Sequence, residues 1–285
     1  MKRKIVKKFL AVSFLGASVL VVASCGNKNN GEKIKILAET KGSPKPFVYQ
    51  NDNGELLGYD VAVVKAIFDK LPEYELEIQI NSSALTDVQT GIADFTFNNW
   101  TYNDERSESY YFSYPYTRAK YVINSLKGHQ LYTFSDIAES GLKVYGTAGN
   151  NITNAIEQYN KKNPDNQIEI DYTSVDQTVK IQDYLDGRYV EIASIATLTA
   201  SKEAYPEQYS NLEYHIIPDE YVKENISKST TSHLLFPKNE KSDELRKKVS
   251  NVIKELYDDN TLEKLANKWV GINIVPNKED FIFLN

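Results

Sequence analysis

The chain has 285 residues, of which 41% are hydrophobic, and it carries a formal net charge of −6 at pH 7. This length allows one large domain or two of average size, with enough apolar residues for a sizeable core. The acidic balance argues against a nucleic-acid partner, since nucleic-acid-binding domains present basic surfaces. The single cysteine excludes an internal disulfide.

The sequence lacks the familiar signatures of catalytic and cofactor sites. It contains no nucleophile elbow, no phosphate-binding loop and no dinucleotide fingerprint. Its three histidines are far apart, and none has the spacing of metal ligands. We therefore expect no metal, no cofactor and no catalytic residue.

The first 24 residues have the three-part pattern of a secretory signal peptide. A basic start is followed by an apolar run from Phe9 to Val22 and by the small residues Ala23 and Ser24. The apolar run is shorter than the roughly 20 residues that a membrane-spanning helix needs. Cleavage after Ser24 removes five positive charges and leaves 261 residues with a formal charge of −11.

Cys25 is predicted to carry a lipid anchor. The sequence Val22-Ala23-Ser24-Cys25 resembles the bacterial lipobox, in which the cysteine receives two acyl chains before cleavage. Two chains give stable membrane anchoring, whereas one gives only marginal binding. The alternative is a buried structural cysteine, which does not fit this position in the chain. The polar residues 25–32, which include glycines, are expected to form a flexible tether.

Beyond the tether, strands and helices are predicted to alternate. Strands are expected at 33–38, 75–80 and 93–98, and helices at 59–71 and 84–90. We expect Asp60 to cap the first of these helices. The β-α-β-α-β order favours a parallel sheet covered by helices.

The second half of the chain repeats this pattern and ends in two helices. Strands are expected at 142–146, 167–172 and 190–195, and helices at 150–161, 175–185 and 196–203. Ser242 is expected to cap the first terminal helix, and Thr261 the second, which ends at Trp269. Two such units predict two lobes, with crossings near residues 114–116 and 227–232.

The segment from Gly91 to Arg106 carries the strongest chemical signal. A strand is predicted to end near Asn98 and a helix to begin near Asn103, which places Arg106 in the first helical turn. Ligands of α/β sheets bind at the carboxyl ends of strands, and an arginine there can bind a carboxylate through two hydrogen bonds. A surface arginine paired with the neighbouring acidic residues is the alternative.

At this point the chain resembles the polar amino-acid-binding proteins of ABC importers, which are family 3 of the solute-binding proteins. The resemblance rests on the order and spacing of several motifs over roughly residues 33–271. They are Pro46-Phe47, Gly54 to Val61, Gly91-x-x-Asp94, Asp104-Glu105-Arg106, Phe112 to Tyr116, Leu142 to Gly149, Asp186-Gly187-Arg188 and Asp259 to Gly271.

The resemblance implies an α/β fold of the type II periplasmic-binding-protein kind. Two lobes with mixed, largely parallel sheets are joined by two hinge crossings. Lobe one would comprise residues 33–119 plus 232–285, and lobe two residues 123–228. Such a protein closes its lobes on a small ligand.

The implied function is capture of an amino acid or small amino-acid derivative for an ABC permease, without an enzymatic step. The protein is expected to be a monomer, held by membrane lipid through Cys25 at the extracytoplasmic face of the cell membrane. A Gram-positive host fits, because a cell without an outer membrane would lose a diffusible receptor. The alternatives are a dehydratase-like enzyme, for which Glu191 is the clear acid or base, and a lipid-anchored sensor or adhesin.

The resemblance also implies ligand-binding residues. Arg106 matches the arginine that binds the ligand α-carboxylate, and Thr101 matches a residue that assists through its backbone N–H and hydroxyl. Asn99 falls at a backbone-contact position. Asn150 and Asn151 fall at a turn that contacts the ligand from lobe two. Two aromatic residues complete the expected set, Phe47 of the Pro-Phe motif and Trp100, which can stack on the ligand.

One position departs from the family pattern. An aspartate that usually holds the ligand ammonium is replaced by Ile195, between Ser194 and Ala196. An unpaired buried ammonium is costly, so another acid is needed or the ligand is held differently. The candidate acids are Glu191, Asp219 and Glu220. Cystine, a modified amino acid and a glutathione-like peptide all stay open as ligands.

Overall fold

The computed structural model describes residues 33–42 and 45–284. The predicted signal peptide 1–24, Cys25 and the tether 25–32 lie outside the described residues, so they stay predictions. Within the described residues, no helix is long and apolar enough to cross a membrane.

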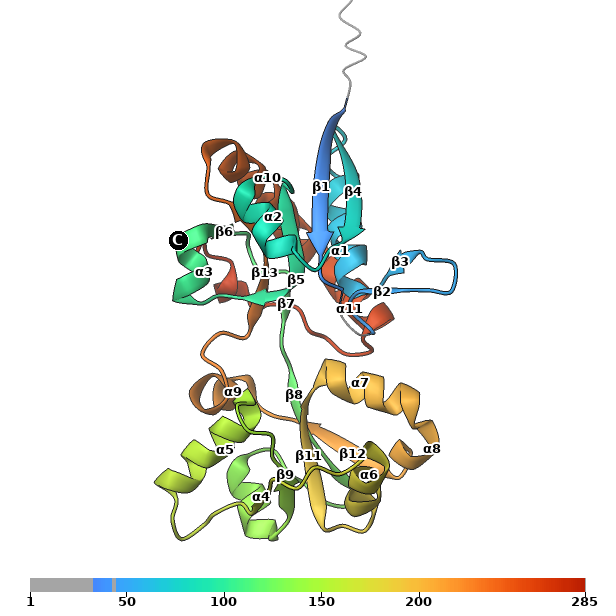
Figure 1. Cartoon of the computed structure of the whole chain (residues 1–285), viewed down its shortest axis with the longest axis vertical. Helices are drawn as coiled ribbons and strands as arrows, with labels where there is room; N and C mark the ends of the chain where they lie inside the picture. Colours follow the sequence, from blue (N-terminus) through green and yellow to red (C-terminus); the bar gives the residue numbers. More distant parts are fainter. Residues whose placement is uncertain (1–32, 43–44, 285) are drawn as a thin grey trace, which may run out of the picture. The chain divides into compact units, whose positions relative to one another are not determined.

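The first β-sheet combines strands from the two ends of the described chain (Figure 1). Its six strands are β1 (Ile34–Thr40), β4 (Tyr74–Ile80), β5 (Phe95–Thr101), β6 (Tyr110–Phe112), β7 (Thr117–Arg118) and β13 (Thr231–Pro237). The strand order is β4-β1-β5-β13-β6, and β7 also pairs with β13. β1 is parallel to β4 and β5, whereas β13 is antiparallel to its partners.

Helices cover both faces of this sheet because its central strands are apolar on both sides. The helices are α1 (Tyr59–Asp69), α2 (Ala84–Thr90), α3 (Asp104–Ser109), α10 (Glu240–Asp258) and α11 (Thr261–Trp269). On one face, the ring of Phe95 stacks between those of Phe68 and Phe236 at 5.6 and 5.3 Å. On the other face, Val88 of α2 and Trp100 belong to a separate cluster.

The second sheet is formed by the middle of the chain. Its strands are β8 (Tyr121–Leu126), β9 (Lys143–Tyr145), β10 (Ile170–Asp171), β11 (Tyr189–Ser194) and β12 (Leu212–Ile216), in the order β10-β9-β11-β8-β12. The first three of that order are parallel, and β8 is antiparallel to both its neighbours. Each sheet is therefore mixed, with one parallel part and one antiparallel part.

The remaining elements surround the second sheet or lie outside both sheets. They are α4 (Phe134–Ser140), α5 (Asn151–Lys162), α6 (Gln177–Leu185), α7 (Ile195–Ala204), α8 (Pro206–Tyr209), α9 (Asp219–Asn225), the hairpin β2 (Tyr49–Gln50) with β3 (Leu56–Leu57), and the 3₁₀ helix η1 (Lys278–Asp280). A core of its own, which includes Ile123, Phe134 and Val190, holds this lobe together.

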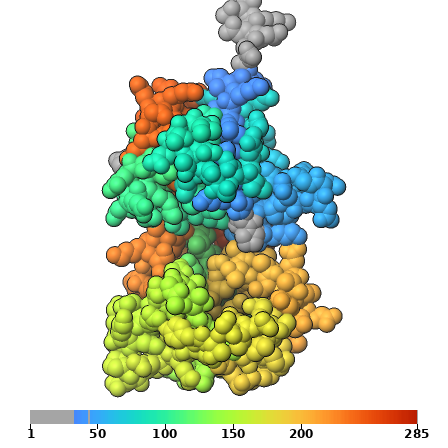
Figure 2. Space-filling view, in the orientation of Figure 1, coloured from blue at the N-terminus to red at the C-terminus, as the bar shows by residue number. Residues whose placement is uncertain are grey.

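The chain crosses between the sheets twice. It passes from β7 to β8 through residues 119–120 and returns from α9 to β13 through residues 226–230. Figure 2 shows the outcome on the surface, where yellow-green and yellow residues from the middle of the chain form one lobe. Blue, teal and orange-red residues from the two ends together form the other. The lobe limits given above stay a prediction.

A fully buried arginine lies at the first crossing. The Arg118 guanidinium forms ion pairs with Asp219, at 3.4 Å, and with Asp280. Lys120 also pairs with Asp219, at 2.7 Å. Because a buried guanidinium is costly without partners, this cluster ties the first crossing to α9 and to the C-terminal segment.

Three of the predicted helix caps were wrong. Asp60 lies fully buried inside α1, whose cap residue is Gly58. The cap of α10 is Asn239, whose side chain accepts a hydrogen bond from the Ser242 backbone N–H. Asn260 rather than Thr261 precedes α11. In each case the helix begins before its first regularly spaced apolar residue. The reason is that its first turn is polar or is held by tertiary contacts.

Gly58 fixes the backbone next to a predicted ligand residue. Its φ of +119° is a conformation that residues with a Cβ avoid. A Cβ there would lie 2.2 Å from the carbonyl oxygen of Phe47. That same oxygen accepts a hydrogen bond from the Asp60 backbone N–H at 3.1 Å. Glycine therefore lets α1 approach and hold the Phe47 backbone.

We predict that Asp219→Asn lowers the free energy of unfolding by about 3 kcal/mol, because it leaves Arg118 and Lys120 with too little negative charge in a buried site. Urea unfolding monitored by circular dichroism measures this. The control is Asp258→Asn, which breaks an exposed pair with Lys254 and is expected to change stability by less than about 0.5 kcal/mol. Equal effects of the two substitutions would show that the buried cluster does not stabilise the fold.

Candidate functional site

Two adjoining cavities lie where the chain crosses between the lobes. The first has a volume of about 220 Å³ and is lined by residues of both lobes, among them Phe47, Asn99 and Thr101 from lobe one and residues 194–196 from lobe two. The second, of about 470 Å³, is lined by lobe-two residues and by Tyr121 of the crossing strand. Tyr121 and Ser194 line both cavities, so the two cavities adjoin at these residues.

The end of β5 presents Asn99 and Thr101 to the first cavity. Asn99 has a φ of +54°, which is unusual for a residue other than glycine and especially within a strand. The register of β5 against β13 shifts between His233 and Leu235, so the pairing is irregular here. Such local departures from regular backbone cluster at binding sites. The distortion redirects backbone groups at the end of a sheet strand, where α/β folds bind ligands.

Phe47 forms an apolar wall of the first cavity. Its side chain is almost fully buried, and its ring meets that of Tyr59 edge to face at 6.2 Å. The Tyr59 hydroxyl in turn donates a hydrogen bond to the Tyr116 carbonyl oxygen at 2.9 Å. The ring is thus fixed by α1 and by the segment that leads to the crossing.

Arg106 is oriented by local contacts. The Asn103 side chain caps α3 and accepts a hydrogen bond from the Arg106 backbone N–H at 2.7 Å. The guanidinium donates to the Thr101 carbonyl oxygen at 2.8 Å and lies over the Trp100 ring, 5.3 Å from its centroid. The guanidinium therefore contacts a carbonyl oxygen and an aromatic ring. In the described chain it does not pair with the neighbouring acidic side chains, as a surface arginine without a binding role was expected to do.

Arg106 does not line the first cavity. It borders a different one, of about 360 Å³, together with Asn103, Glu105 and Tyr110. Arg106 is linked to the first cavity by its hydrogen bond to Thr101, because Thr101 lines that cavity. Most of the five donors of a guanidinium are left for another acceptor.

Trp100 is largely buried. Its indole N–H donates a hydrogen bond to the Thr96 hydroxyl at 3.3 Å. The Arg106 guanidinium and the Lys41 ammonium both lie within 6 Å of the centroid of its ring. Packing in the core cluster with Phe112 and Leu235 accounts for most of its burial. The structure thus places Trp100 beside Arg106 as its support.

Asn150 and Asn151 lie at the start of α5 and line the second cavity. The Asn150 side-chain oxygen accepts hydrogen bonds from the Ile152 and Thr153 backbone N–H groups, at 2.8 and 3.4 Å, and so caps the helix. The Asn151 amide donates to the Tyr121 hydroxyl at 3.3 Å. Five of the seven predicted ligand residues therefore border the two adjoining cavities, and Arg106 and Trp100 lie behind Thr101.

The three candidate acids differ in their surroundings. Asp219 already forms ion pairs with Arg118 and Lys120. Glu220 is exposed. Glu191 is half-buried and lines the second cavity, and burial raises its pKa above the ordinary value. Ile195 itself is buried and lines the first cavity, which is therefore apolar where the family aspartate is expected.

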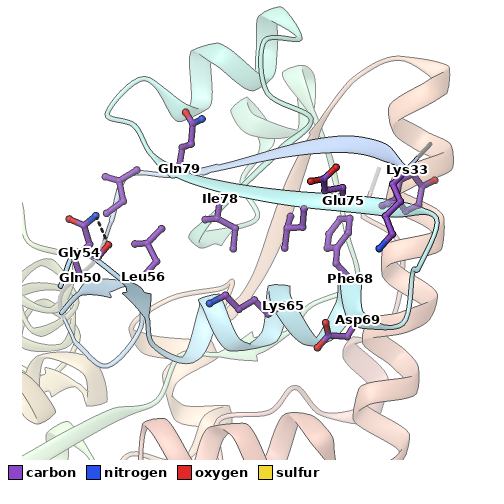
Figure 3. A pocket seen from close by; sticks show the side chains of 13 residues that line it. Lys33, Gln50, Gly54, Leu56, Lys65, Phe68, Asp69, Glu75, Ile78 and Gln79 are labelled. Carbon is purple, nitrogen blue, oxygen red and sulfur yellow. Dashed lines mark hydrogen bonds between the residues drawn. The ribbon is translucent and has the colours of Figure 1, made fainter. Parts of the chain in front are cut away.

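A larger cavity, of about 850 Å³, lies elsewhere. It is bordered by the β2–β3 hairpin, α1 and the edge strand β4 (Figure 3). Lys65 and Asp69 on α1 lie across it from Glu75 and Ile78 on β4. None of the seven predicted ligand residues lines it, so its size alone does not make it the candidate site.

The comparisons with known proteins agree with the geometry. A profile of the bacterial extracellular solute-binding proteins, family 3, matches residues 36–272. The chain belongs to this family. The predicted family is thereby confirmed, and the chain is an extracellular solute-binding protein. Members of the family are receptors for solutes, and neither the enzyme nor the sensor or adhesin alternative gains support.

Similar proteins span nearly the whole chain. The probable amino-acid-binding protein YxeM of Bacillus subtilis is 29% identical over 280 residues, which cover 94% of this chain and 97% of YxeM. The arginine-binding extracellular protein ArtP of B. subtilis is 27% identical over 270 residues, covering 92% and 98% of the two chains.

A solved structure from work on glutathione import through GshT and the cystine ABC importer TcyBC of Streptococcus mutans is also similar. It shares 27% identity and a TM-score of 0.60, covering 87% of this chain and all of that one. The predicted two-lobe fold is confirmed.

We predict that Asn150→Ala lowers the free energy of unfolding by about 1 kcal/mol, because the first turn of α5 loses its cap. Asn151→Ala is the matched control, since that side chain caps nothing, and is expected to cost less than about 0.5 kcal/mol. Chemical denaturation of both variants without added ligand measures the difference. A loss of stability in the control as large as in Asn150→Ala would contradict the capping role.

Proposed function

We propose that the protein is the lipid-anchored ligand receptor of an ABC importer and that its ligand is an amino acid or a small amino-acid derivative. The observation that carries this proposal is the first cavity, which has walls from both lobes and lies at the carboxyl end of β5. The descriptions of YxeM and ArtP as amino-acid- and arginine-binding proteins support the ligand class.

The site residues divide into an anion-binding part and supporting walls. Arg106 and Thr101 bind the ligand carboxylate, and the strained backbone at Asn99 turns a polar group toward it. Because the guanidinium is already held by the Thr101 carbonyl oxygen, it can bind an anion with little loss of side-chain entropy. Phe47 forms the apolar wall, and Trp100 supports the guanidinium from behind.

Lobe two completes the site. Asn150 caps the start of α5, and Asn151 presents its backbone N–H and its side-chain amide to the ligand. Binding proceeds by capture on one lobe followed by rotation about the two crossings, which encloses the ligand. Lobe one comprises residues 33–119 plus 232–285, and lobe two residues 123–228. The enclosed form then docks on a membrane permease.

The N-terminus fits this role. A signal peptide over residues 1–24 and acylation of Cys25 hold the mature monomer at the extracytoplasmic face of the cell membrane. A tether over residues 25–32 leaves the lobes free to close. This arrangement suits a Gram-positive cell, in which a diffusible receptor is lost to the medium.

The test of ligand class is a thermal-shift screen of the mature protein with single amino acids, cystine, glutathione and γ-glutamyl dipeptides. One strong stabiliser is expected, because a ligand at a hundred times its dissociation constant adds about 2.7 kcal/mol to the unfolding free energy. A screen in which sugars or polyamines stabilise the protein and none of these compounds does would overturn the proposal.

We predict that Arg106→Ala weakens binding of the strongest stabiliser by at least about tenfold, because a charged hydrogen-bonding partner of the carboxylate is removed. Isothermal titration calorimetry measures the affinity. The control is Lys247→Ala, which removes an exposed cation of α10 far along the chain from the site and is expected to leave affinity unchanged. Unchanged affinity in Arg106→Ala, with an intact fold by circular dichroism, would exclude the carboxylate role.

A further inference from the structure

The second cavity contains a carboxylate that the contacts proposed so far do not use. Glu191 lies on β11, directly opposite Asn124 of β8. Its Oε2 atom accepts hydrogen bonds from the Asn124 side-chain amide and from the Tyr209 hydroxyl, each at 3.1 Å. Among the residues that the structure describes, Oε1 has no hydrogen-bond partner and is not fully buried, and Glu191 lines the cavity.

The partners of Glu191 hold it from behind. Gln177 of α6 donates to the Tyr209 hydroxyl at 3.5 Å, and that hydroxyl donates onward to Oε2. Three elements, α6, α8 and β8, thus fix the orientation of one side chain. A carboxylate that is fixed in this way presents its second oxygen to the cavity without further loss of side-chain freedom.

The cavity supplies no cation that pairs with this oxygen. Lys180 also lines it, but its ammonium lies over the Tyr145 ring, 5.3 Å from the centroid, and forms no ion pair with Glu191 in the described chain. The other ionisable groups that line the cavity are tyrosine hydroxyls, of Tyr121, Tyr145 and Tyr184. The Lys180 charge favours the ionised form of Glu191, but burial outweighs it and raises the Glu191 pKa. A half-buried carboxylate without a close ion-pair partner is costly, and such a perturbed group in a cleft is a candidate functional residue.

The position of Glu191 complements the apolar first cavity. Ile195 and Ala196 line that cavity and offer no acid to a ligand ammonium. Glu191 and Ser194 belong to the same strand, β11, and Ser194 borders both cavities. The cavity on the far side of Ser194 from Thr101 is therefore the one that Glu191 lines. The second cavity alone has a volume within the range of about 300–1,000 Å³ that small-molecule sites occupy.

We propose that Glu191 binds a cationic amino group of the ligand in the second cavity, and that the substrate class is therefore extended zwitterionic amino-acid derivatives rather than small neutral amino acids. This inference rests on the proposed function. The carboxylate end of such a ligand lies near Thr101 and Arg106. Its ammonium, displaced from the usual position, lies beyond Ser194 and donates to Oε1 of Glu191.

The test compares Glu191→Gln with the wild-type protein by isothermal titration calorimetry. The probes are L-cystine, glutathione, L-arginine and glycine, each with its N-acetylated form. Glutamine keeps the shape and a carbonyl oxygen for Asn124 and Tyr209 but removes the charge. We expect the wild-type protein to prefer an extended compound with a free amino group over glycine, and Glu191→Gln to weaken that compound at least about tenfold, as loss of a charged hydrogen bond implies.

The N-acetylated form separates recognition of the amino group from general damage. It is expected to bind the wild-type protein weakly and to bind Glu191→Gln with the same weak affinity. Glu220→Gln is the matched control, since it makes the same substitution at an exposed carboxylate that lines neither cavity. It is expected to bind the preferred compound as tightly as the wild-type protein.

The outcomes separate this inference from the proposed function. If no probe binds the wild-type protein, both fail together. If a probe binds the wild-type protein and Glu191→Gln equally well, only the inference fails. A purely structural role for Glu191 would instead lower the melting temperature of the unliganded variant and leave its affinity unchanged, which also overturns the inference.

Discussion

The fully buried Arg118 guanidinium is the interaction on which the arrangement of the lobes depends. It lies where the chain leaves the first sheet, and its partners come from α9 of lobe two and from the 3₁₀ helix near the C-terminus. The same segment is held by hydrogen bonds from the Thr117 hydroxyl and the Arg118 backbone N–H to the Ile274 carbonyl oxygen, at 3.2 and 2.7 Å. Separating the guanidinium from its carboxylates leaves a buried charge, and breaking the other two bonds leaves buried polar groups. These contacts therefore stabilise the conformation of the crossing in this structure and the cavity walls beside it.

The two cavities beside this crossing offer different chemistry. The first is mostly apolar and ends at the distorted backbone of Asn99, with the Arg106 guanidinium behind it. The second contains the Glu191 carboxylate, fixed from behind and free toward the cavity. β11 borders both cavities. In the proposed binding mode, this strand sets the distance between the groups that bind the two ends of a ligand. The proposal therefore predicts selectivity for longer ligands, since a short ligand cannot contact both charged groups.

Local sequence signals predicted many of the strands and helices and the position of Arg106 in a first helical turn, because periodicity and capping residues act over a few positions. They did not predict the strands β8, β12 and β13. Motif order predicted the family. The contacts of distant residues were out of reach: Glu191 is oriented by Asn124, 67 residues away in sequence. The positive φ of Asn99 depends on irregular pairing with β13, which follows more than a hundred residues later. For the same reason Asp60 was read as a cap, although tertiary contacts bury it.

The most direct test of this account is native mass spectrometry of the mature protein after incubation with a small-molecule extract of rich growth medium. The account predicts one dominant adduct that is released on denaturation and contains both a carboxylate and a free amino group, separated by more than a single carbon. An adduct without a carboxylate or without an amino nitrogen, such as a sugar, would contradict it, as would the absence of any adduct.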